Sequence, residues 1–428
     1  MPSPLHIAFI SEHASPVAVL GGADAGGQNV YVDELSRSLA AVGHRVDVYT
    51  RRDSPHTPEA VEWARGVRVI NVEAGPALPI SKDAIWPYMV RFRDEIVRFW
   101  LREGEHPDIV HANFWMSGWA GVELRQRVGT PIVQIFHALG TTKARQQGAD
   151  DTSPRERIAV EQRVVREADR VIAQCPCELR ELLADYGAQA EKVALIPAAV
   201  NTERFHPIAQ QQARQMLGLP PHLPLLVYVG RLLPRKDVRN IVRALALLVR
   251  GVRADAEPPR LLVVGGESAE PDPAITPEIG ELHKLAGDLG MSHLVEFVGH
   301  KQPDVLHLYY SAADAAITTP WYEPFGLTPL EAMACGAPVV GSAVGGIPFT
   351  VQHGVSGLLV PPRDPTALAE AVGSLLSQPE LRERMGAAAR ARVEREFTWA
   401  TVASRVEALY HSMLHQSPSE QALLATHR

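Results

Sequence analysis

Short apolar runs alternate with longer amphipathic runs from one end of the chain to the other. Residues 5–10 form the first apolar run, and residues 28–42 carry Val32, Leu35 and Leu39 on one face of a predicted helix. Such alternation predicts βαβ units, in which helices connect the parallel strands of a sheet. Further strands are expected over residues 45–50, 67–72, 108–112, 131–136, 170–173, 193–196, 225–229, 260–264, 295–298, 315–318, 338–341 and 358–360.

The alternation breaks once, over residues 197–224, where proline, glutamine and other polar residues accumulate. We therefore expect two α/β domains, an N-terminal domain of residues 1–205 and a C-terminal domain of residues 206–397. Residues 398–428 are expected to form a closing helix and a frayed polar tail.

Composition and charge narrow the class of protein. The chain has 428 residues, 46% of them hydrophobic and 21% charged, which suits a soluble protein with two domains of ordinary size. Its formal net charge of −7 argues against nucleic acid as the main partner. The early apolar run at residues 7–10 is too short for a signal peptide or a membrane span. We therefore expect a cytoplasmic protein without an integral membrane segment.

The cysteines indicate no disulfide framework. Cys175, Cys177 and Cys335 are too few for one, and too few for a four-cysteine zinc site. The first two are either a redox pair or incidental residues at a strand-to-helix turn. No acidic metal-binding pattern is evident, so we expect no metal site.

The most informative stretch is residues 319–336, which lies between a predicted strand and a predicted helix. It holds two carboxylates separated by seven residues, Glu323 in the loop and Glu331 about one turn inside the helix. A strand-loop-helix unit aims backbone N–H groups and a positive dipole end beyond the strand. One carboxylate can then face the reacting end of a ligand, and the other a more distant part. The alternative is a surface loop glutamate and a solvated helix glutamate.

This stretch resembles the retaining glycosyltransferases of family 4, whose hallmark is the same glutamate spacing with Phe-Gly-Leu inside it. The resemblance covers roughly residues 5–400. It implies the GT-B fold, with two Rossmann-like domains whose parallel sheets face each other across a cleft, and a last helix that crosses back to the first domain. In that family the first glutamate approaches the donor sugar and the second holds the ribose hydroxyls. The resemblance implies further donor contacts at Phe325, Gly326, Leu327 and Thr328.

A glycine-rich loop at residues 21–28 follows the first predicted strand. Glycines let the backbone approach a ligand closely, although this loop matches neither the dinucleotide fingerprint nor a Walker loop. The alternative is a flexible surface connection. Residues 24–32 resemble sucrose-phosphate synthases and the glycosyltransferase that starts mycothiol synthesis. That resemblance implies donor contacts from Gly26 and Gly27, and an acceptor contact from Gln28.

Basic residues after another strand suit a diphosphate. Arg231 and Lys236 match the family's Gly-Arg-x(4)-Lys pattern, and they offer a planar fork and a compact point charge to the phosphates. The alternative is a solvated pair of basic residues. Gly265, at the end of the next strand, is expected to line the nucleotide cleft.

Two other strand ends indicate the acceptor side, since ligands of open α/β sheets bind beyond the carboxyl ends of the strands. His137 matches the family's active-site histidine, although a lone histidine is often structural. Phe114 stands where relatives with phosphorylated acceptors have tyrosine, and Ala138 where they have serine or threonine, so two hydroxyl groups are missing. The basic residues that could still bind a phosphate, or could be surface charges, are Lys82, Lys143 and Arg157.

Together these resemblances imply a retaining glycosyltransferase similar to sucrose-phosphate synthase. It would move a sugar from a UDP-, ADP- or GDP-linked donor to a hydroxyl of a sugar or sugar phosphate. His137, Glu323, Arg231 and Lys236 would act in catalysis, with no cofactor besides the nucleotide-sugar co-substrate. One alternative is a mycothiol-type transferase with an inositol phosphate acceptor. Another is a non-catalytic sugar-nucleotide sensor on the same fold.

Overall fold

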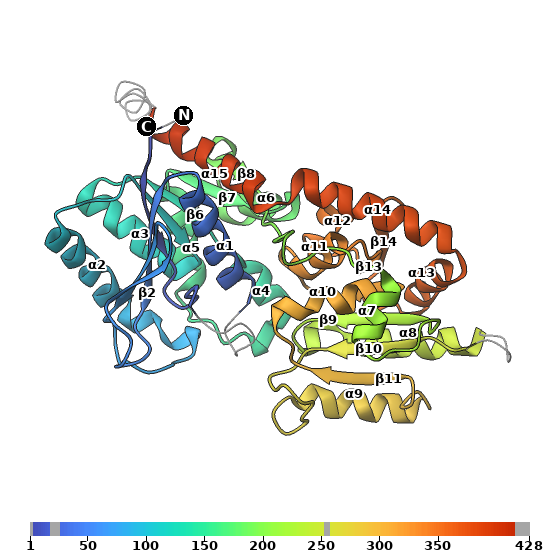
Figure 1. The fold of residues 1–428 in the computed structure, drawn as a ribbon. Coiled ribbons are helices and arrows are strands. Elements are labelled where there is room, and N and C mark those ends of the chain that lie inside the picture. The colour runs from blue at the N-terminus through green and yellow to red at the C-terminus, as the bar shows by residue number, and fades with distance from the viewer. Residues whose placement is uncertain (1–2, 18–25, 252–256, 416–428) are drawn as a thin grey trace. The chain divides into compact units, whose positions relative to one another are not determined.

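The computed structural model describes residues 3–17, 26–251 and 257–415, which divide into two compact units (Figure 1). The first unit contains the described residues up to Pro197 together with those from Trp399 onward, and the second contains residues 198–398. The sequence placed this division at residue 205. Residues 198–205 belong to the second unit, where Val200 N–H donates to Phe397 O at 3.0 Å and Phe205 packs against Tyr310.

The first unit is built on an eight-stranded sheet in the order β3-β4-β2-β1-β5-β6-β7-β8. All neighbours are parallel except β3, an edge strand that pairs antiparallel with β4 and that the sequence did not predict. The strands are β1 His6–Ile10, β2 Arg45–Arg51, β3 Ala60–Ala64, β4 Val67–Val72, β5 Ile109–Asn113, β6 Ile132–Ile135, β7 Arg170–Ala173 and β8 Val193–Leu195.

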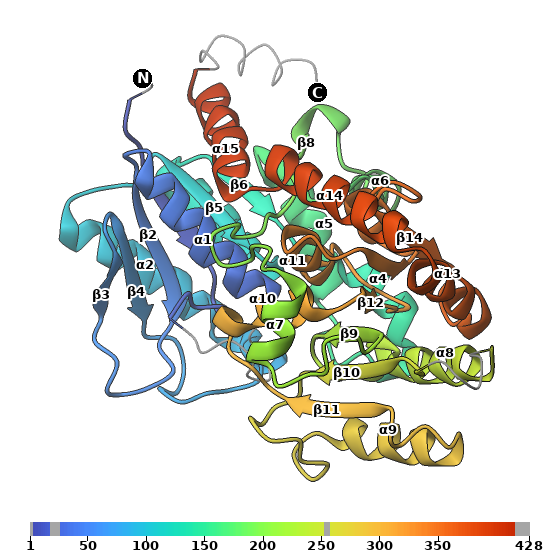
Figure 2. The ribbon, with the colours of Figure 1, turned by 45° about the vertical axis from the view of Figure 1, so that its right-hand side comes forward.

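Helices cover both faces of this sheet. Helices α1 and α15 pack together on one face, and the row α2, α3, α5 and α6 packs on the other, as right-handed βαβ connections require (Figures 1 and 2). The helices of this unit are α1 Gly27–Ala41, α2 Met89–Glu103, α3 Trp115–Val128, α4 Gly140–Gln147, α5 Arg157–Glu167, α6 Pro176–Tyr186 and α15 Trp399–Leu414.

The second unit is built on a six-stranded parallel sheet in the order β11-β10-β9-β12-β13-β14. Its central strands are buried on both faces, which explains why they read as continuous apolar runs in the sequence. The strands are β9 Leu225–Val229, β10 Arg260–Val264, β11 Val295–Gly299, β12 Ala315–Thr318, β13 Val339–Ser342 and β14 Gly357–Val360.

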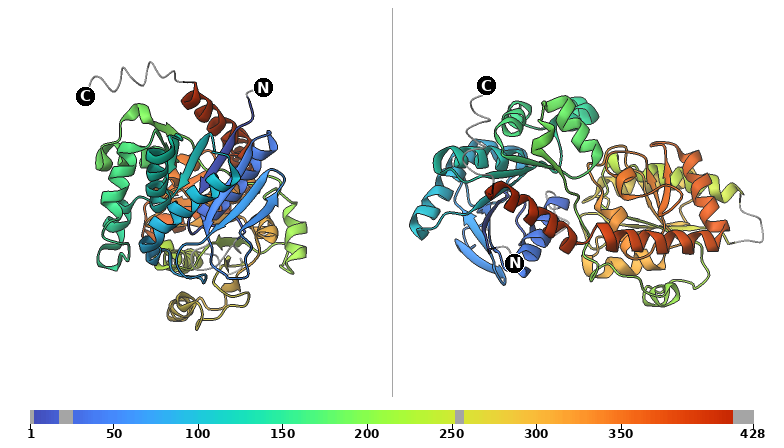
Figure 3. Two further views of the ribbon diagram at one scale, coloured as in Figure 1. Left: turned by 90° about the vertical axis from the view of Figure 1, so that its left-hand side faces the viewer. Right: turned by 90° about the horizontal axis from the view of Figure 1, so that it is seen from above.

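Helices also cover both faces of the second sheet. One layer holds α8, α9 and α13, and the other holds α7, α10, α11 and α14; the long α14 is orange-red in Figure 3. The helices are α7 Gln210–Met216, α8 Val238–Gly251, α9 Pro277–Asp288, α10 Pro303–Ala312, α11 Leu327–Ala334, α12 Ile347–Thr350, α13 Pro365–Ser377 and α14 Pro379–Glu396. Among the residues that the structure describes, no helix is both long and apolar enough to cross a membrane.

Among the parallel strands of each sheet the order reverses once, between β1 and β5 in the first unit and between β9 and β12 in the second. Connections leave such a point in opposite directions, so the carboxyl ends of the two strands are left uncovered. Several of the segments predicted to bind the substrates follow these four strands, while His137 follows β6 and Gly265 follows β10.

Candidate functional site

The centre of the candidate site in the second unit is an ion pair between Lys236 and Glu323. Lys236 ends the 3₁₀ turn Pro234–Lys236 after β9, and Glu323 lies in the loop after β12, the neighbouring strand. The Lys236 ammonium donates a short hydrogen bond to a Glu323 carboxylate oxygen. Arg235 Nη1 lies 3.9 Å from the same oxygen, and Arg235 O accepts a hydrogen bond from Trp321 N–H at 3.1 Å. The two loops are therefore held together by charge and by backbone.

This arrangement keeps the Glu323 carboxylate ionised. Burial by itself raises the pKa of Glu323, but the positive charges of Lys236 and Arg235 bring it below its usual range. Burial lowers the pKa of Lys236, and the Glu323 charge opposes that change. A carboxylate and an ammonium thus face each other, each with only 14% of its side chain exposed, and such partly buried charges interact more strongly than charges in bulk water.

Two glycines fix the loop that carries Glu323. A side chain at Gly345 would place its Cβ 1.7 Å from Glu323 O, and one at Gly346 would place its Cβ 2.5 Å from Phe325 O. Only glycine therefore allows this close approach. Gly326 follows with φ of 91° and caps the N-terminus of α11, whose first N–H groups have no partner within the helix.

Glu331, one turn into α11, has a different environment from Glu323. It accepts a hydrogen bond from the Tyr310 hydroxyl on α10 at 2.9 Å. Burial raises the pKa of Glu331 to about 7, because the Tyr310 hydrogen bond and the positive charges of Arg204 and Lys236 offset only part of the desolvation. The two carboxylates of one motif therefore differ in ionisation near neutral pH.

The turn that carries Arg231 lies at the carboxyl end of β9. Arg231 O accepts hydrogen bonds from the Tyr228 hydroxyl at 2.8 Å and from Leu233 N–H at 3.1 Å. Gly265 follows β10 with φ of 154°, and a Cβ there would lie 1.9 Å from Gly230 O. Gly265 therefore lets the ends of β9 and β10 lie close together.

In the first unit, three strand ends are joined by side-chain hydrogen bonds. Gln28 Nε2, on α1 after β1, donates to Ser11 Oγ at 3.1 Å and to Asn113 O at 3.4 Å. Asn113 is the last residue of β5, and its amide oxygen lies 3.1 Å from Nε2 of His137, which follows β6. The sequence missed Asn113, although it directly precedes Phe114 at a predicted strand end. Gln28 and His137 are thus brought together, as the carboxyl ends of neighbouring strands require.

Two residues at these strand ends have left-handed backbones, Phe114 with φ of 82° and His137 with φ of 59°. Residues other than glycine rarely adopt this conformation, and they do so mainly where function or packing demands it.

Gly26 and Gly27 begin α1, and Gly26 N–H donates to the Asn29 amide oxygen at 2.9 Å. The rest of the predicted glycine-rich loop, residues 21–25, lies outside the described residues.

Arg157, predicted as a possible phosphate ligand, is only 2% exposed. Its guanidinium donates to Glu161 at 2.8 Å and to Ala138 O at 2.6 Å, and it lies 5.0 Å from the centre of the Phe114 ring. These contacts hold the two strand ends in place. To meet a phosphate, the guanidinium would have to exchange some of them.

Lys143 and Lys82 lie near the same segment, residues 151–153. Lys143 forms an ion pair with Asp151 at 3.0 Å and donates to Ser153 Oγ at 2.9 Å. Lys82 begins a 3₁₀ turn whose next residue, Asp83, accepts a hydrogen bond from Thr152 at 2.5 Å. The predicted basic residues are therefore gathered, but carboxylates neutralise both Lys143 and Arg157.

Cys175 is the N-cap of α6. Its sulfur accepts a hydrogen bond from Glu178 N–H at 3.5 Å. Burial raises the pKa of Cys175 to about 12, and it also raises that of Cys177, so neither thiol is activated. These contacts favour the reading of incidental residues at a turn over that of a redox pair.

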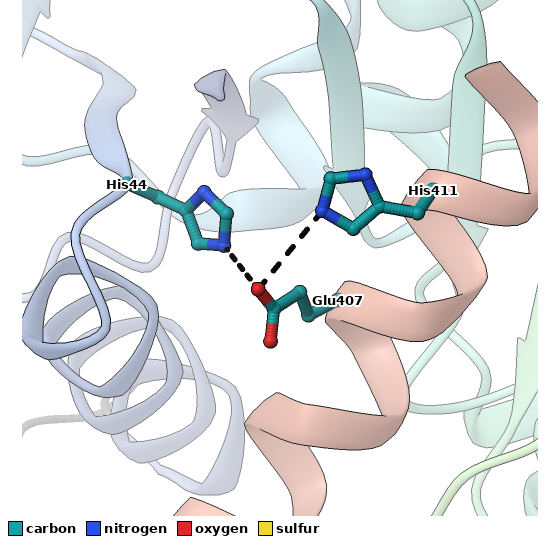
Figure 4. Close-up of side chains that lie close together, drawn as sticks. All are labelled: His44, Glu407 and His411. Carbon is teal, nitrogen blue, oxygen red and sulfur yellow. Dashed lines mark hydrogen bonds and ion pairs between the residues drawn. The ribbon is translucent and has the colours of Figure 1, made fainter. Parts of the chain in front are cut away.

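One cluster has the composition of a metal site. His44, from the turn before β2, lies beside Glu407 and His411 on α15, and their ligand atoms are all within 4.8 Å of one another (Figure 4). His44 Nδ1 accepts a hydrogen bond from Leu5 N–H at 3.0 Å. A neutral ring then carries its proton on Nε2, the atom that would have to bind the ion. That proton is donated to Glu407 Oε1 at 3.2 Å. The cluster is therefore a hydrogen-bonded contact that attaches α15 to the rest of the first unit.

We expect zinc to leave the melting temperature unchanged, and His44→Ala to lower the free energy of unfolding. The loss should be about 1–3 kcal/mol, because Leu5 N–H would be buried without an acceptor. Thermal and urea unfolding measure both effects, with His56→Ala at an exposed position as the control. A rise in melting temperature with zinc that disappears in His44→Ala would identify a metal site instead.

Comparison with known proteins covers nearly the whole chain. Residues 26–199 match the family model described as "Glycosyl transferase 4-like domain", and residues 209–392 match "Glycosyl transferases group 1". The chain is 37% identical over 413 residues to the D-inositol 3-phosphate glycosyltransferase of Corynebacterium diphtheriae, which covers 95% of this chain and 94% of the relative. The enzyme of the same name from Streptomyces scabiei is also 37% identical, over 96% of this chain and 92% of its own.

Among solved structures, the chain is similar to sucrose-phosphate synthase from Thermosynechococcus elongatus. The TM-score is 0.86 with 35% sequence identity, over 96% of this chain and 100% of the synthase. The similar proteins therefore include a sucrose-phosphate synthase, one of the two kinds of enzyme that residues 24–32 resemble, as well as inositol phosphate glycosyltransferases.

Proposed function

Because this chain belongs to the family 4 glycosyltransferases, which have the GT-B fold, we propose that it moves a sugar from a nucleoside diphosphate sugar to a hydroxyl of a sugar or sugar phosphate. The fold class and the enzyme class predicted from the sequence are confirmed. The donor base, the acceptor and the role of each residue are part of the proposal.

The observation that carries the proposal is the Lys236–Glu323 pair beside the N-terminus of α11. When the bond between the sugar and the diphosphate breaks, negative charge develops on the leaving phosphate oxygen. Lys236, Arg231 and the N–H groups of Leu327 and Thr328 would stabilise that charge. This stabilisation needs no cofactor besides the co-substrate.

Glu323 would lie beside the transferred sugar, and Glu331 would accept hydrogen bonds from the ribose hydroxyls. An ionised Glu323 suits the first role, since a positive charge develops at the sugar carbon as the leaving group departs. Within the first unit, His137, Gln28 and the backbone of Gly26 and Gly27 are the proposed substrate contacts.

Thermal-shift measurements with UDP, ADP, GDP and their sugar conjugates test the proposal. A ligand that binds the native state raises the melting temperature by mass action. We expect one nucleotide family to stand out, and its sugar conjugate to be hydrolysed or transferred in a coupled assay. Binding without any turnover would favour the non-catalytic sensor instead. If none of the sugar nucleotides binds, the proposed function is wrong.

Two acceptors are favoured by specific similarities, an inositol phosphate by the 37% identical relatives and fructose 6-phosphate by the similarity to sucrose-phosphate synthase. Phe114 and Ala138 bring no hydroxyl group to either, and Arg157 and Lys143 are neutralised within the first unit. We therefore propose that the protein captures a phosphate less strongly than relatives with phosphorylated acceptors, or that it uses another acceptor.

The acceptor prediction concerns the double variant Phe114→Tyr with Ala138→Ser. Two restored hydroxyl groups should lower the Michaelis constant for a phosphorylated acceptor by about tenfold or more, since each new hydrogen bond contributes roughly 0.5–1.5 kcal/mol. Kinetics with fructose, fructose 6-phosphate and inositol 3-phosphate measure the change. The unphosphorylated sugar is the control and should not gain. Efficient use of fructose 6-phosphate by the unmodified protein, with no gain in the variant, would contradict this reading.

Nucleotide binding should depend on pH through Glu331. Its pKa is about 7 in the free protein, raised by burial, and ribose hydroxyls bind the ionised form better. Binding should therefore strengthen as pH rises from 6 to 8, by about tenfold, with release of a proton. Calorimetry in two buffers of different ionisation enthalpy measures that proton. In the variant Glu331→Gln, nucleotide affinity should depend on pH only through the titration of the nucleotide itself. If the affinity of this variant varies with pH as in the unmodified protein, a group other than Glu331 is responsible.

A further inference from the structure

We propose that Asn113 is a positioning residue that fixes the tautomer of His137, so that the ring carries its proton on Nε2 and presents Nδ1 as a hydrogen-bond acceptor. The proposal goes beyond the role of His137 as a neighbour of the sugar, because it states which atom of the ring is protonated. It rests on the proposed function only for the identity of the group that Nδ1 meets.

The orientation of the Asn113 amide follows from its partners. The side chain is fully buried, and one end of the amide faces two carbonyl oxygens, Ile10 O at 3.4 Å and His111 O at 3.2 Å. Carbonyl oxygens only accept hydrogen bonds, so the NH₂ group must be at that end. The amide oxygen is therefore at the other end, where it lies 3.1 Å from His137 Nε2.

An amide oxygen can only accept, so the hydrogen bond exists only if His137 Nε2 carries a proton. Burial, together with the nearby His111 and His13, holds the pKa of His137 well below its usual range. The ring is then neutral at pH 7 and has a single ring proton. With that proton on Nε2, Nδ1 has a free lone pair.

The ring is also fixed in place. His137 has a left-handed backbone, and the Tyr31 ring packs against it edge to face, with ring centres 5.0 Å apart and planes at 72°. Asn113 is held in turn, because its backbone carbonyl accepts a hydrogen bond from Gln28 Nε2 at 3.4 Å. Residues at three strand ends thus fix the position and the protonation of the His137 ring. In proteins generally, the hydrogen bond made by one ring nitrogen of a histidine determines which nitrogen carries the proton.

This tautomer has a chemical consequence for the ligand. An unprotonated Nδ1 accepts a hydrogen bond from a hydroxyl group but repels a phosphate oxygen or a ring oxygen, which also present lone pairs. The group that meets His137 should therefore be a hydroxyl of the bound sugar. The opposite tautomer would leave the buried Asn113 oxygen facing another lone pair, at the cost of an unsatisfied polar group.

Nitrogen NMR of the protein labelled with ¹⁵N-histidine tests the proposal without reference to activity. The signal of His137, identified by its loss in His137→Gln, should report a neutral ring with the proton on Nε2 at pH 7.5. A proton on Nδ1, or a doubly protonated ring, would overturn the proposal whatever the enzyme transfers.

Variants give a second test. Asn113→Leu should shift the His137 signal toward the other tautomer and lower kcat about tenfold, the effect of one lost hydrogen bond, while the affinity for free nucleotide stays unchanged. Asn71→Leu is the matched control, since this buried asparagine also donates to a backbone carbonyl, Pro58 O at 2.8 Å, but lies on β4. An unchanged His137 tautomer in Asn113→Leu would also overturn the proposal.

If Asn113→Leu does not fold, Asn113→Asp replaces it. A carboxylate at this position should raise the pKa of His137, so that activity is lost at low pH and recovers as the pH rises. A pH profile identical to that of the unmodified protein would contradict a positioning role. The test of the tautomer and the test of the proposed function can fail independently. A protein that transfers sugar while His137 has the other tautomer refutes only the role of Asn113. A protein with the expected tautomer that transfers nothing refutes only the function.

Discussion

Lys236→Ala is expected to lower turnover by about 100-fold or more, as does the loss of one group that stabilises a developing oxyanion. Two effects add in this variant. The leaving diphosphate loses a positive charge, and Glu323 loses the ammonium that keeps it ionised. Arg231→Ala should have a similar effect on the rate through the first cause alone.

Steady-state kinetics over a range of pH separate these causes. Without Lys236, burial should dominate and raise the pKa of Glu323, so the residual activity of Lys236→Ala should need a higher pH. Arg231→Ala should show no such shift of comparable size. Lys284→Ala, at an exposed position of α9, controls for the loss of a positive charge and should be as active as the unmodified protein. Normal turnover in both Lys236→Ala and Arg231→Ala would remove these residues from the site.

The two carboxylates are expected to respond oppositely to replacement by glutamine. Glu323→Gln should lower the rate by about 100-fold and leave nucleotide affinity almost unchanged, because its charge acts on the breaking bond. Glu331→Gln should weaken nucleotide binding by about 10- to 100-fold, the value of hydrogen bonds to a charged group. Its effect on the rate at saturation should be small, since a ribose contact is the same in the ground state and the transition state.

Calorimetry with nucleotide alone, beside kinetics with saturating donor, measures both parts. Glu383→Gln, at an exposed position of α14, is the control for loss of a carboxylate. If Glu323→Gln loses affinity and Glu331→Gln loses only rate, the two roles are reversed.

The sequence predicted most of the sheets, because parallel strands buried on both faces leave continuous apolar runs. It missed β3, whose half-exposed residues include Glu62 and which pairs antiparallel at an edge. It also placed the end of the first domain at residue 205, whereas the first unit of the structure ends at Pro197 before α15 returns to it. The polar segment 197–224 has no hydrophobic pattern that shows which unit its first residues belong to.

For the site, the motifs predicted which residues matter but not which of them touch. Lys236 and Glu323 are 87 residues apart, and their contact depends on the strand order that makes β9 and β12 neighbours. The ion pair between Arg157 and Glu161 could have been predicted from the sequence. Glu161 follows Arg157 by four residues, which is the spacing of an ion pair within a helix. Asn113 carries no motif of its own, and its role becomes visible only through the two carbonyl groups that orient its amide.

The place of α15 in the first unit determines the order in which the chain can mature on the ribosome. Tyr410 pairs with His111, 299 residues earlier, and Glu407 pairs with His44, 363 residues earlier. The described residues of the second unit all lie within residues 198–398. This unit therefore does not need α15 to complete its fold. The face of the first unit that α15 covers stays exposed until residues 399–414 have emerged, after the whole of the described second unit. Nascent chains are prone to misassembly through such exposed apolar faces. Of the two units, the one whose sheet comes earlier in the sequence is thus completed later.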